Sequence, residues 1–124
     1  MSDVAIRIVL DTSAVMAYAK GSENVGEVLI EVTDEGGAFA VPVVCLLEGS
    51  KSAPEANVRL LTSNPACRVL PLLSEDWPRL LAGVRLLSRL DLATALYAAG
   101  REGYVLTGEP DAYGEIGGQA VIEI

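Results

Sequence analysis

Four acidic residues, Asp11, Glu48, Asp91 and Glu109, could form a metal-binding site although they are far apart in the sequence. Most residues next to them are apolar, and a carboxylate in apolar surroundings is costly unless it is paired or bound to a cation. Carboxylate oxygens suit hard ions such as Mg²⁺ or Mn²⁺. A bound ion of this kind can hold a phosphate and lower the pKa of a water molecule. The chemistry that these residues could perform is therefore phosphodiester hydrolysis.

Each acid also has an ordinary structural interpretation. Asp11 could cap a helix, and Asp91 could be a carboxylate favoured by the dipole at a helix N-terminus. Glu48 and Glu109 could be solvated surface acids. The site hypothesis therefore depends on whether the fold brings all four together.

Other chemistries lack the residues that they need. The chain has no histidine, which removes a Ser-His-Asp triad, a Cys-His pair and a histidine general base. Cys45 and Cys67 match no zinc or redox spacing, and we expect two reduced, buried thiols in a helix and a strand.

The 124 residues correspond to one domain, residues 1–124, and 51% of them are hydrophobic. Only 5% are aromatic, so the core must consist of Val, Leu, Ile and Ala. We expect a cytoplasmic protein with no membrane contact, because the N-terminus does not resemble a signal peptide and no apolar run approaches the ~20 residues of a membrane span.

The net charge is −8, with 17 acidic and 9 basic residues. This balance argues against tight nonspecific binding to nucleic acid and suits a protein that binds cations or a basic partner. Arg79, Arg85 and Arg89 are interpreted as surface charge. Most of the four tyrosines are expected to pack in the core rather than to stack on bases.

Strands alternate with helices along the chain. Strands are predicted at residues 4–10, 38–41, 67–72, 104–107 and 119–124, and the residues between 108 and 118 are rich in turn formers. Helices are predicted from Ser13 and Ser74, both as N-caps, from Pro42, Pro54 and Asp91, and over residues 25–32; Gly103 is expected to end the helix from Asp91. This order predicts an α/β fold with a mostly parallel sheet, in which ligands collect at the carboxyl ends of the strands.

Three segments carry a resemblance to a known family. The stretch IVLDTSAVMAYAKG resembles the opening motif of PIN-domain proteins, especially VapC-type toxins of bacterial toxin–antitoxin pairs. VPVVCLLEGSK and RLDLATALYAAGREGYVLTGEPDAY resemble the second and third motifs. Together, in this order, the segments cover essentially the whole chain.

The resemblance implies a three-layer α/β/α fold with a five-stranded, mostly parallel sheet. It also implies an endoribonuclease that depends on Mg²⁺ or Mn²⁺, with Asp11, Glu48 and Asp91 as metal-holding acids. Ser13 and Thr107 match hydroxyl positions beside the pocket. The implied partners are an RNA substrate, a cognate antitoxin protein and a second copy of the chain in a homodimer.

One position departs from the family pattern. The family has Thr-x-Asp after the fourth strand, whereas this chain has Thr107-Gly108-Glu109, with Asp111 two residues further on. Glu109 can still act as a fourth catalytic and metal-binding acid, but its extra methylene moves the carboxylate by ~1.5 Å. The alternative function is therefore a catalytically weakened PIN-like module that binds protein or RNA.

A response-regulator receiver domain is a further alternative with a similar acidic pocket. It needs an aspartate after the third strand and a lysine after the fifth. Here Leu72, Leu73 and Ser74 follow the third strand, and no lysine follows Lys51. This alternative is set aside.

Overall fold

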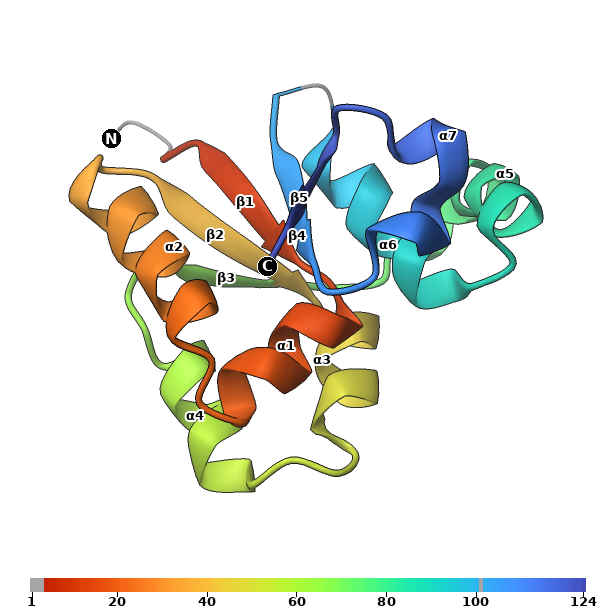
Figure 1. Ribbon diagram of the computed structural model, residues 1–124. Coiled ribbons are helices and arrows are strands. Elements are labelled where there is room, and N and C mark those ends of the chain that lie inside the picture. Colours follow the sequence, from red (N-terminus) through yellow and green to blue (C-terminus); the bar gives the residue numbers. More distant parts are fainter. Residues whose placement is uncertain (1–3, 101) are drawn as a thin grey trace.

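The computed structural model describes residues 4–100 and 102–124, and a five-stranded sheet lies at its centre (Figure 1). The strand order is β3-β2-β1-β4-β5, and all four neighbouring pairs are parallel. The strands are β1 (Ile6–Leu10), β2 (Ala38–Pro42), β3 (Cys67–Leu70), β4 (Tyr104–Thr107) and β5 (Val121–Glu123). The α/β class and the parallel sheet predicted from the sequence are confirmed.

Helices connect successive strands, as parallel pairing requires. Within the described residues they are α1 (Thr12–Ala19), α2 (Glu23–Asp34), α3 (Val43–Ser50), α4 (Glu55–Thr62), α5 (Trp77–Leu87), α6 (Leu90–Ala99) and α7 (Gly114–Gly117). Two short 3₁₀ turns, η1 (Ser74–Asp76) and η2 (Pro110–Tyr113), precede α5 and α7.

The strands bury side chains on both faces, so the helices form a layer on each side of the sheet. In β1, Ile8 and Leu10 pack into one core cluster together with residues of α1, α2 and α4. Val9 points the opposite way and packs with residues of α3, α6 and η2. The same alternation separates Leu106 from Val105 in β4. This arrangement is the predicted three-layer α/β/α architecture, built mainly from aliphatic residues.

Two predicted helix caps differ in the structure. Asp11, rather than Ser13, is the N-cap of α1, and its side chain accepts a hydrogen bond from the backbone of Ala14. Ser74 begins the 3₁₀ turn η1, and the long helix α5 starts only at Trp77. The hydrophobic stripe over this region predicted the helix, but it could not show where the tighter first turn would end.

The chain between α6 and β5 is also more structured than its composition predicts. Helix α6 ends at Gly100, which has a positive φ of 59° that favours glycine, rather than at the predicted Gly103. The turn-rich segment after β4 contains both η2 and α7. It folds back over the sheet and buries Tyr113 completely, which holds this segment near the carboxyl edge of the sheet.

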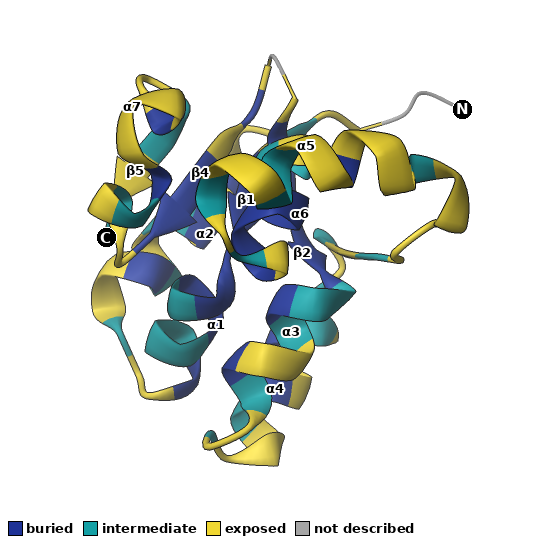
Figure 2. Ribbon diagram, turned by 90° about the vertical axis from the view of Figure 1, so that its right-hand side faces the viewer, coloured by how far each residue is buried: buried dark blue, intermediate teal, exposed yellow. Residues whose placement is uncertain are grey.

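Helix α5 is the most exposed part of the second layer (Figure 2). Only Leu80 among its residues is buried, and Trp77 is 65% exposed. A hollow of about 490 Å³ lies along the inner side of this helix. It is lined by Leu72, Leu73, Ser74, Trp77, Leu80, Leu81, Val84 and Leu90. None of the helices in residues 4–100 and 102–124 has the length and apolar character needed to cross a membrane.

Candidate active site

Asp11 lies directly after β1 and is fully buried. One of its oxygens, Oδ1, accepts hydrogen bonds from the Ser13 hydroxyl at 2.7 Å and from the Ala14 backbone N–H at 3.0 Å. The helix cap therefore fixes the carboxylate at the N-terminus of α1, where the helix dipole favours a negative charge. The capping role and the predicted site role are compatible, because Oδ2 is left to face the opposite layer.

Tyr113 supplies the contact on that second oxygen. Its buried hydroxyl donates a hydrogen bond to Oδ2 of Asp11 over 2.7 Å. Burial raises the pKa of Tyr113, and the neighbouring negative charge of Asp11 raises it further, so the phenol stays protonated and can only donate here. No local sequence pattern indicates this contact, because 102 residues separate the two partners.

Asp91 lies in the first turn of α6 and is 7% exposed. The Thr12 hydroxyl, from the residue after Asp11, donates to Oδ2 of Asp91 over 2.6 Å. Thr12 thus links the N-termini of α1 and α6 at the carboxyl edge of the sheet. The structure brings together two of the predicted acids, Asp11 and Asp91, at the place expected from the order of strands and helices.

Both carboxylates also lie close to the thiol of Cys45 on α3. Burial is the main reason why the pKa of Cys45 rises to about 12, and the charges of Asp11 and Asp91 both add to this increase. The thiol lies 3.2 Å from the backbone carbonyl of Asp91, to which it donates. Cys45 is therefore a neutral packing residue beneath the two acids, in agreement with the predicted buried thiol.

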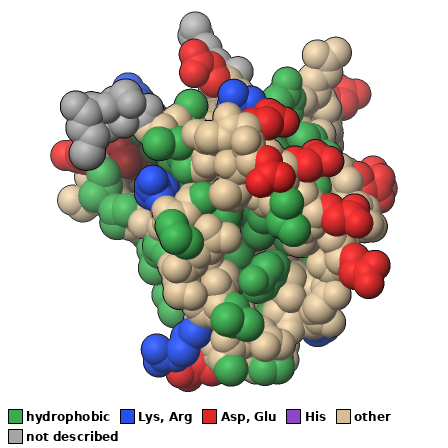
Figure 3. Space-filling model, turned by 90° about the vertical axis from the view of Figure 1, so that its left-hand side faces the viewer, with side chains coloured by type: hydrophobic (Ala, Val, Ile, Leu, Met, Phe, Trp, Pro, Cys, Tyr) green, Lys and Arg blue, Asp and Glu red, His purple; other side chains and the backbone are tan. Residues whose placement is uncertain are grey.

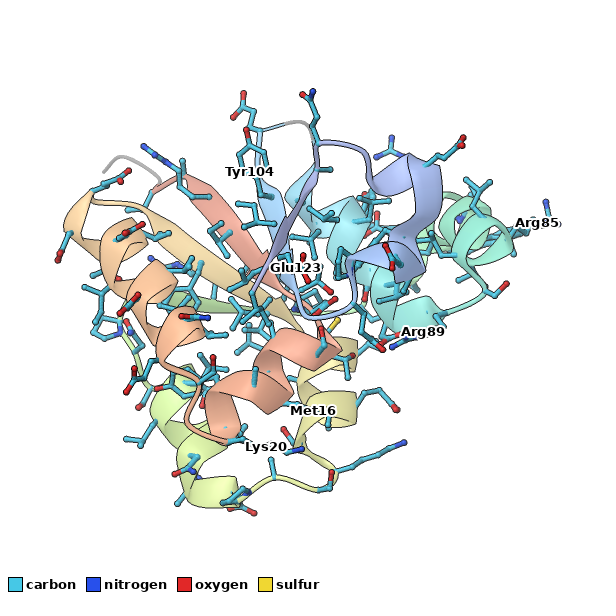
Figure 4. All side chains as sticks on the ribbon, viewed as in Figure 1. Met16, Lys20, Arg85, Arg89, Tyr104 and Glu123 are labelled. Atoms are coloured by element: carbon cyan, nitrogen blue, oxygen red, sulfur yellow. The ribbon has the colours of Figure 1, made fainter. Side chains whose placement is uncertain are left out.

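Arg89 binds both Asp91 and Glu109. Its Nε and Nη2 donate to the two oxygens of Asp91 at 3.1 and 2.8 Å, and Nη1 donates to Oε2 of Glu109 at 3.2 Å. Figure 4 shows the arginine beside the start of α6, whereas Arg85 points away from α5. The interpretation of Arg89 as simple surface charge is wrong, because its guanidinium joins two of the predicted site residues.

The charge on Asp91 is stabilised by these neighbours. Burial raises its pKa, but the hydrogen bonds from Arg89 and Thr12 and the positive charge of Arg89 more than offset this effect, and the pKa is lowered overall. The hydrogen bond to Asp91 is also the main reason why the pKa of Arg89 is raised. Asp91 is consequently ionised at neutral pH, as a metal ligand must be.

The other predicted site residues differ in whether they contact the region of Asp11 and Asp91. Ser13 and Thr107 are neighbours, with their hydroxyl oxygens 3.2 Å apart. Thr107 also accepts from the backbone N–H of Glu109 over 2.9 Å, which fixes the turn after β4. Glu48 is half-exposed and forms an ion pair with Lys51 at 2.9 Å. It has no hydrogen bond to the other three acids.

Glu48 lies on α3, the helix that also carries Cys45 and Gly49. Cys45, one helical turn earlier, lies beneath Asp91, and Gly49 follows Glu48 directly. A Cβ atom on Gly49 would lie 2.8 Å from Val15 and 2.9 Å from the backbone oxygen of Thr12. Glycine therefore lets α3 approach α1 closely, one residue after Glu48 in the chain.

The donor chemistry fits a hard divalent cation, although the acids are not gathered around one point. Asp11 and Asp91 offer buried carboxylate oxygens, with Glu109 and Glu48 at the rim. Within residues 4–100 and 102–124, no three Asp, Glu or Cys side chains are grouped closely enough to hold a metal ion. A cation could be held by Asp11 and Asp91, with Glu109 or Glu48 joining after a side-chain movement.

Comparison with known proteins adds no family assignment. The chain matches no family model, and no curated protein is significantly similar to it.

Proposed function

We propose that this protein is a metal-dependent endoribonuclease of the PIN type, and specifically the toxin of a toxin–antitoxin pair. The observation that carries the proposal is the pair of buried acids at the carboxyl edge of a parallel sheet. Asp11 caps α1, Asp91 lies in the first turn of α6, and Thr12, the residue after Asp11, donates to Asp91. This is the edge at which ligands bind in open α/β folds.

A bound Mg²⁺ or Mn²⁺ would polarise the scissile phosphate and activate a water molecule for attack. The protein's own contribution is to fix the acids. The α1 N-terminus and Ser13 orient Asp11, while Thr12 and the α6 N-terminus orient Asp91. The hydroxyls of Ser13 and Thr107 lie beside Asp11 and can orient a phosphate or a water molecule.

The surface charge limits how RNA would be bound. Acidic side chains gather along one edge of the face seen in Figure 3, where basic side chains are few. With a net charge of −8, the protein has little general attraction for a polyanion. Binding of a restricted set of RNAs through the cation site fits this charge better than nonspecific binding. It also leaves acidic surface for a basic antitoxin.

A cleavage assay on purified protein tests the proposal. Structured and unstructured RNAs are incubated with Mn²⁺, Mg²⁺ or EDTA, using wild-type protein, Asp91→Asn and the matched control Glu27→Gln. Glu27 is an exposed acid on α2, remote in sequence from the site. Cleavage that requires metal, disappears in Asp91→Asn and persists in Glu27→Gln is expected. Equal cleavage by Asp91→Asn would indicate a contaminating nuclease.

A docking module is the second candidate function, and two observations favour it. The predicted acids are paired with side chains of the protein itself, namely Arg89, Tyr113 and Lys51. In addition, the hollow beside α5 exposes large apolar side chains, including Trp77. Absence of Mn²⁺ binding in both the wild type and a variant without Arg89, together with absence of cleavage, would select this function.

A further inference from the structure

The guanidinium of Arg89 covers the carboxylate of Asp91. Both oxygens of Asp91 accept from its guanidinium, and Oδ2 accepts from Thr12 as well. The third nitrogen of the guanidinium reaches Glu109. A guanidinium has donors only and carries a positive charge, so it opposes the approach of a metal ion to the same oxygens by charge repulsion.

We propose that Arg89 is a built-in counter-ion of the carboxylate pocket, and that its guanidinium must leave Asp91 before the pocket takes up a divalent cation. This inference rests on the proposed function, since it concerns the same acids. It adds a positioning residue that controls access to them. Arg89 places a positive charge between Asp91 and Glu109 and so offsets the repulsion between the two carboxylates.

The surroundings of Arg89 allow this movement. Its side chain is 39% exposed, and the residue lies at the N-cap position of α6 with extended backbone angles, outside the helix. The guanidinium can therefore swing into solvent without opening the core. Glu109, its second partner, is also half-exposed, with 48% of the side chain accessible.

Tyr113, the partner of Asp11, is not free to move in the way that Arg89 is. It donates to Asp11 from a completely buried position and packs against the core cluster that contains Val9 and Leu92. Its hydroxyl cannot leave without disturbing that cluster. The two acids of the pocket thus have different kinds of partner. Asp11 is bound by the buried phenol of Tyr113, and Asp91 is bound by the guanidinium of Arg89, which can move into solvent.

Arg89 and Mn²⁺ compete for Asp91, and the size of this effect depends on the strength of the Arg89–Asp91 ion pair. Hydrogen bonds between charged groups contribute most when they are protected from water, and exposed pairs contribute less. We expect removal of the guanidinium to strengthen Mn²⁺ binding roughly tenfold, because the Arg89 side chain is partly exposed to solvent. By linkage, bound Mn²⁺ must weaken the Arg89–Asp91 contact by the same factor.

The test measures Mn²⁺ binding to the RNA-free protein from the electron paramagnetic resonance signal of free Mn²⁺. The variants are Arg89→Gln and the matched control Arg85→Gln, which removes an exposed arginine that points away from the molecule. Arg89→Gln combined with Asp91→Asn shows whether any gained affinity belongs to the pocket. Tighter binding by Arg89→Gln alone, with the control unchanged, is the expected result.

Binding by Arg89→Gln that equals or falls below that of the wild type would overturn the inference and leave the proposed metal site standing. Tight binding that survives the added Asp91→Asn substitution would also overturn it. If neither the wild type nor Arg89→Gln binds Mn²⁺, both the inference and the proposed nuclease function fail. Binding by Arg89→Gln alone would support the inference in its strongest form.

A second measurement on the unmodified protein covers the case in which Arg89→Gln does not fold. The ¹⁵N–¹H signal of the Arg89 Nε group should be protected from solvent exchange in metal-free protein, because that group donates to Asp91. Addition of Mg²⁺ is expected to abolish this protection. Protection that persists at saturating Mg²⁺ would overturn the inference.

Discussion

The Tyr113 hydroxyl donates to Oδ2 of Asp11 across 2.7 Å, and this bond joins the C-terminal η2 turn to the residue that ends the first strand. Ser13 and Ala14 hold the other oxygen of the same carboxylate. Asp11 is therefore fixed from both layers of the fold before any ligand binds. The consequences for stability can be measured separately from catalysis.

Replacement of Tyr113 by phenylalanine should lower the free energy of unfolding by about 1–3 kcal/mol, because it leaves a buried carboxylate oxygen without its donor. Urea denaturation in EDTA measures the change. Tyr97→Phe is the matched control: Tyr97 is 41% exposed and binds only Asp76 and Arg79 at the surface. Loss of the Tyr97 hydroxyl should lower the free energy of unfolding by less than about 0.5 kcal/mol. Equal effects of the two substitutions would contradict the importance of the Tyr113 contact.

The stability that Asp91 contributes should depend on pH. Its pKa is lowered on folding, so its contribution is fully present above the unfolded value of about 3.9 and is lost as the pH falls through the lower folded value. In metal-free protein, the difference in unfolding free energy between wild type and Asp91→Asn should therefore shrink below about pH 4. The variant Glu27→Gln, which lacks an exposed acid of α2, is measured in parallel. A wild-type advantage that stays constant down to acid pH would refute this prediction.

The two thiols should be almost unreactive in the folded protein. Burial raises the pKa of Cys45 to about 12 and that of Cys67 to about 11, so little thiolate exists at neutral pH. In a Cys67→Ser variant, alkylation of Cys45 should follow the urea unfolding curve. Rapid alkylation without urea would mean that the layer beneath Asp91 opens in the native state.

Gly49 should be required for the close approach of α3 and α1. Alanine there would place its Cβ 2.8 Å from Val15 and 2.9 Å from the carbonyl oxygen of Thr12, and that backbone cannot move freely. We expect Gly49→Ala to destabilise the protein by about 1–3 kcal/mol and to weaken Mn²⁺ binding, since Thr12 also positions Asp91. Gly26→Ala on α2 meets nothing within 4 Å and should be neutral or slightly stabilising. Thermal and urea denaturation compare the two variants.

Glu109→Asp tests the departure from the family pattern. The shorter side chain restores the Thr-x-Asp spacing and removes the reach of Glu109 to Arg89. If the nuclease proposal is correct, metal-dependent cleavage should increase, by up to about a hundredfold for a correction of ~1 Å. Stability should change by less than about 1 kcal/mol, because the lost ion pair is exposed. A fall in cleavage would show that glutamate is the productive residue at this position.

The sequence by itself determined the class of fold and the place of the candidate site. Short β-branched runs separated by helical segments predicted strands β1 to β5 and a parallel sheet, because hydrophobic periodicity and turn residues are local signals. Asp11 and Asp91 could be placed at the carboxyl edge for the same reason, since each lies at the boundary of a predicted element. The N-caps predicted at Ser13 and Ser74 differ from those in the structure, because neighbouring residues compete for the same backbone donors.

Only the tertiary structure decided which side chains meet these acids. Nothing in the order of residues places Tyr113 on Asp11 or Arg89 on Glu109, and neither the exposure of Glu48 nor its pairing with Lys51 has a signature in sequence. Such contacts join residues as many as 102 positions apart and depend on how whole layers pack. The sequence therefore supplied the carboxylates, while packing of the two helical layers gave Asp11 a fixed partner and Asp91 a movable one.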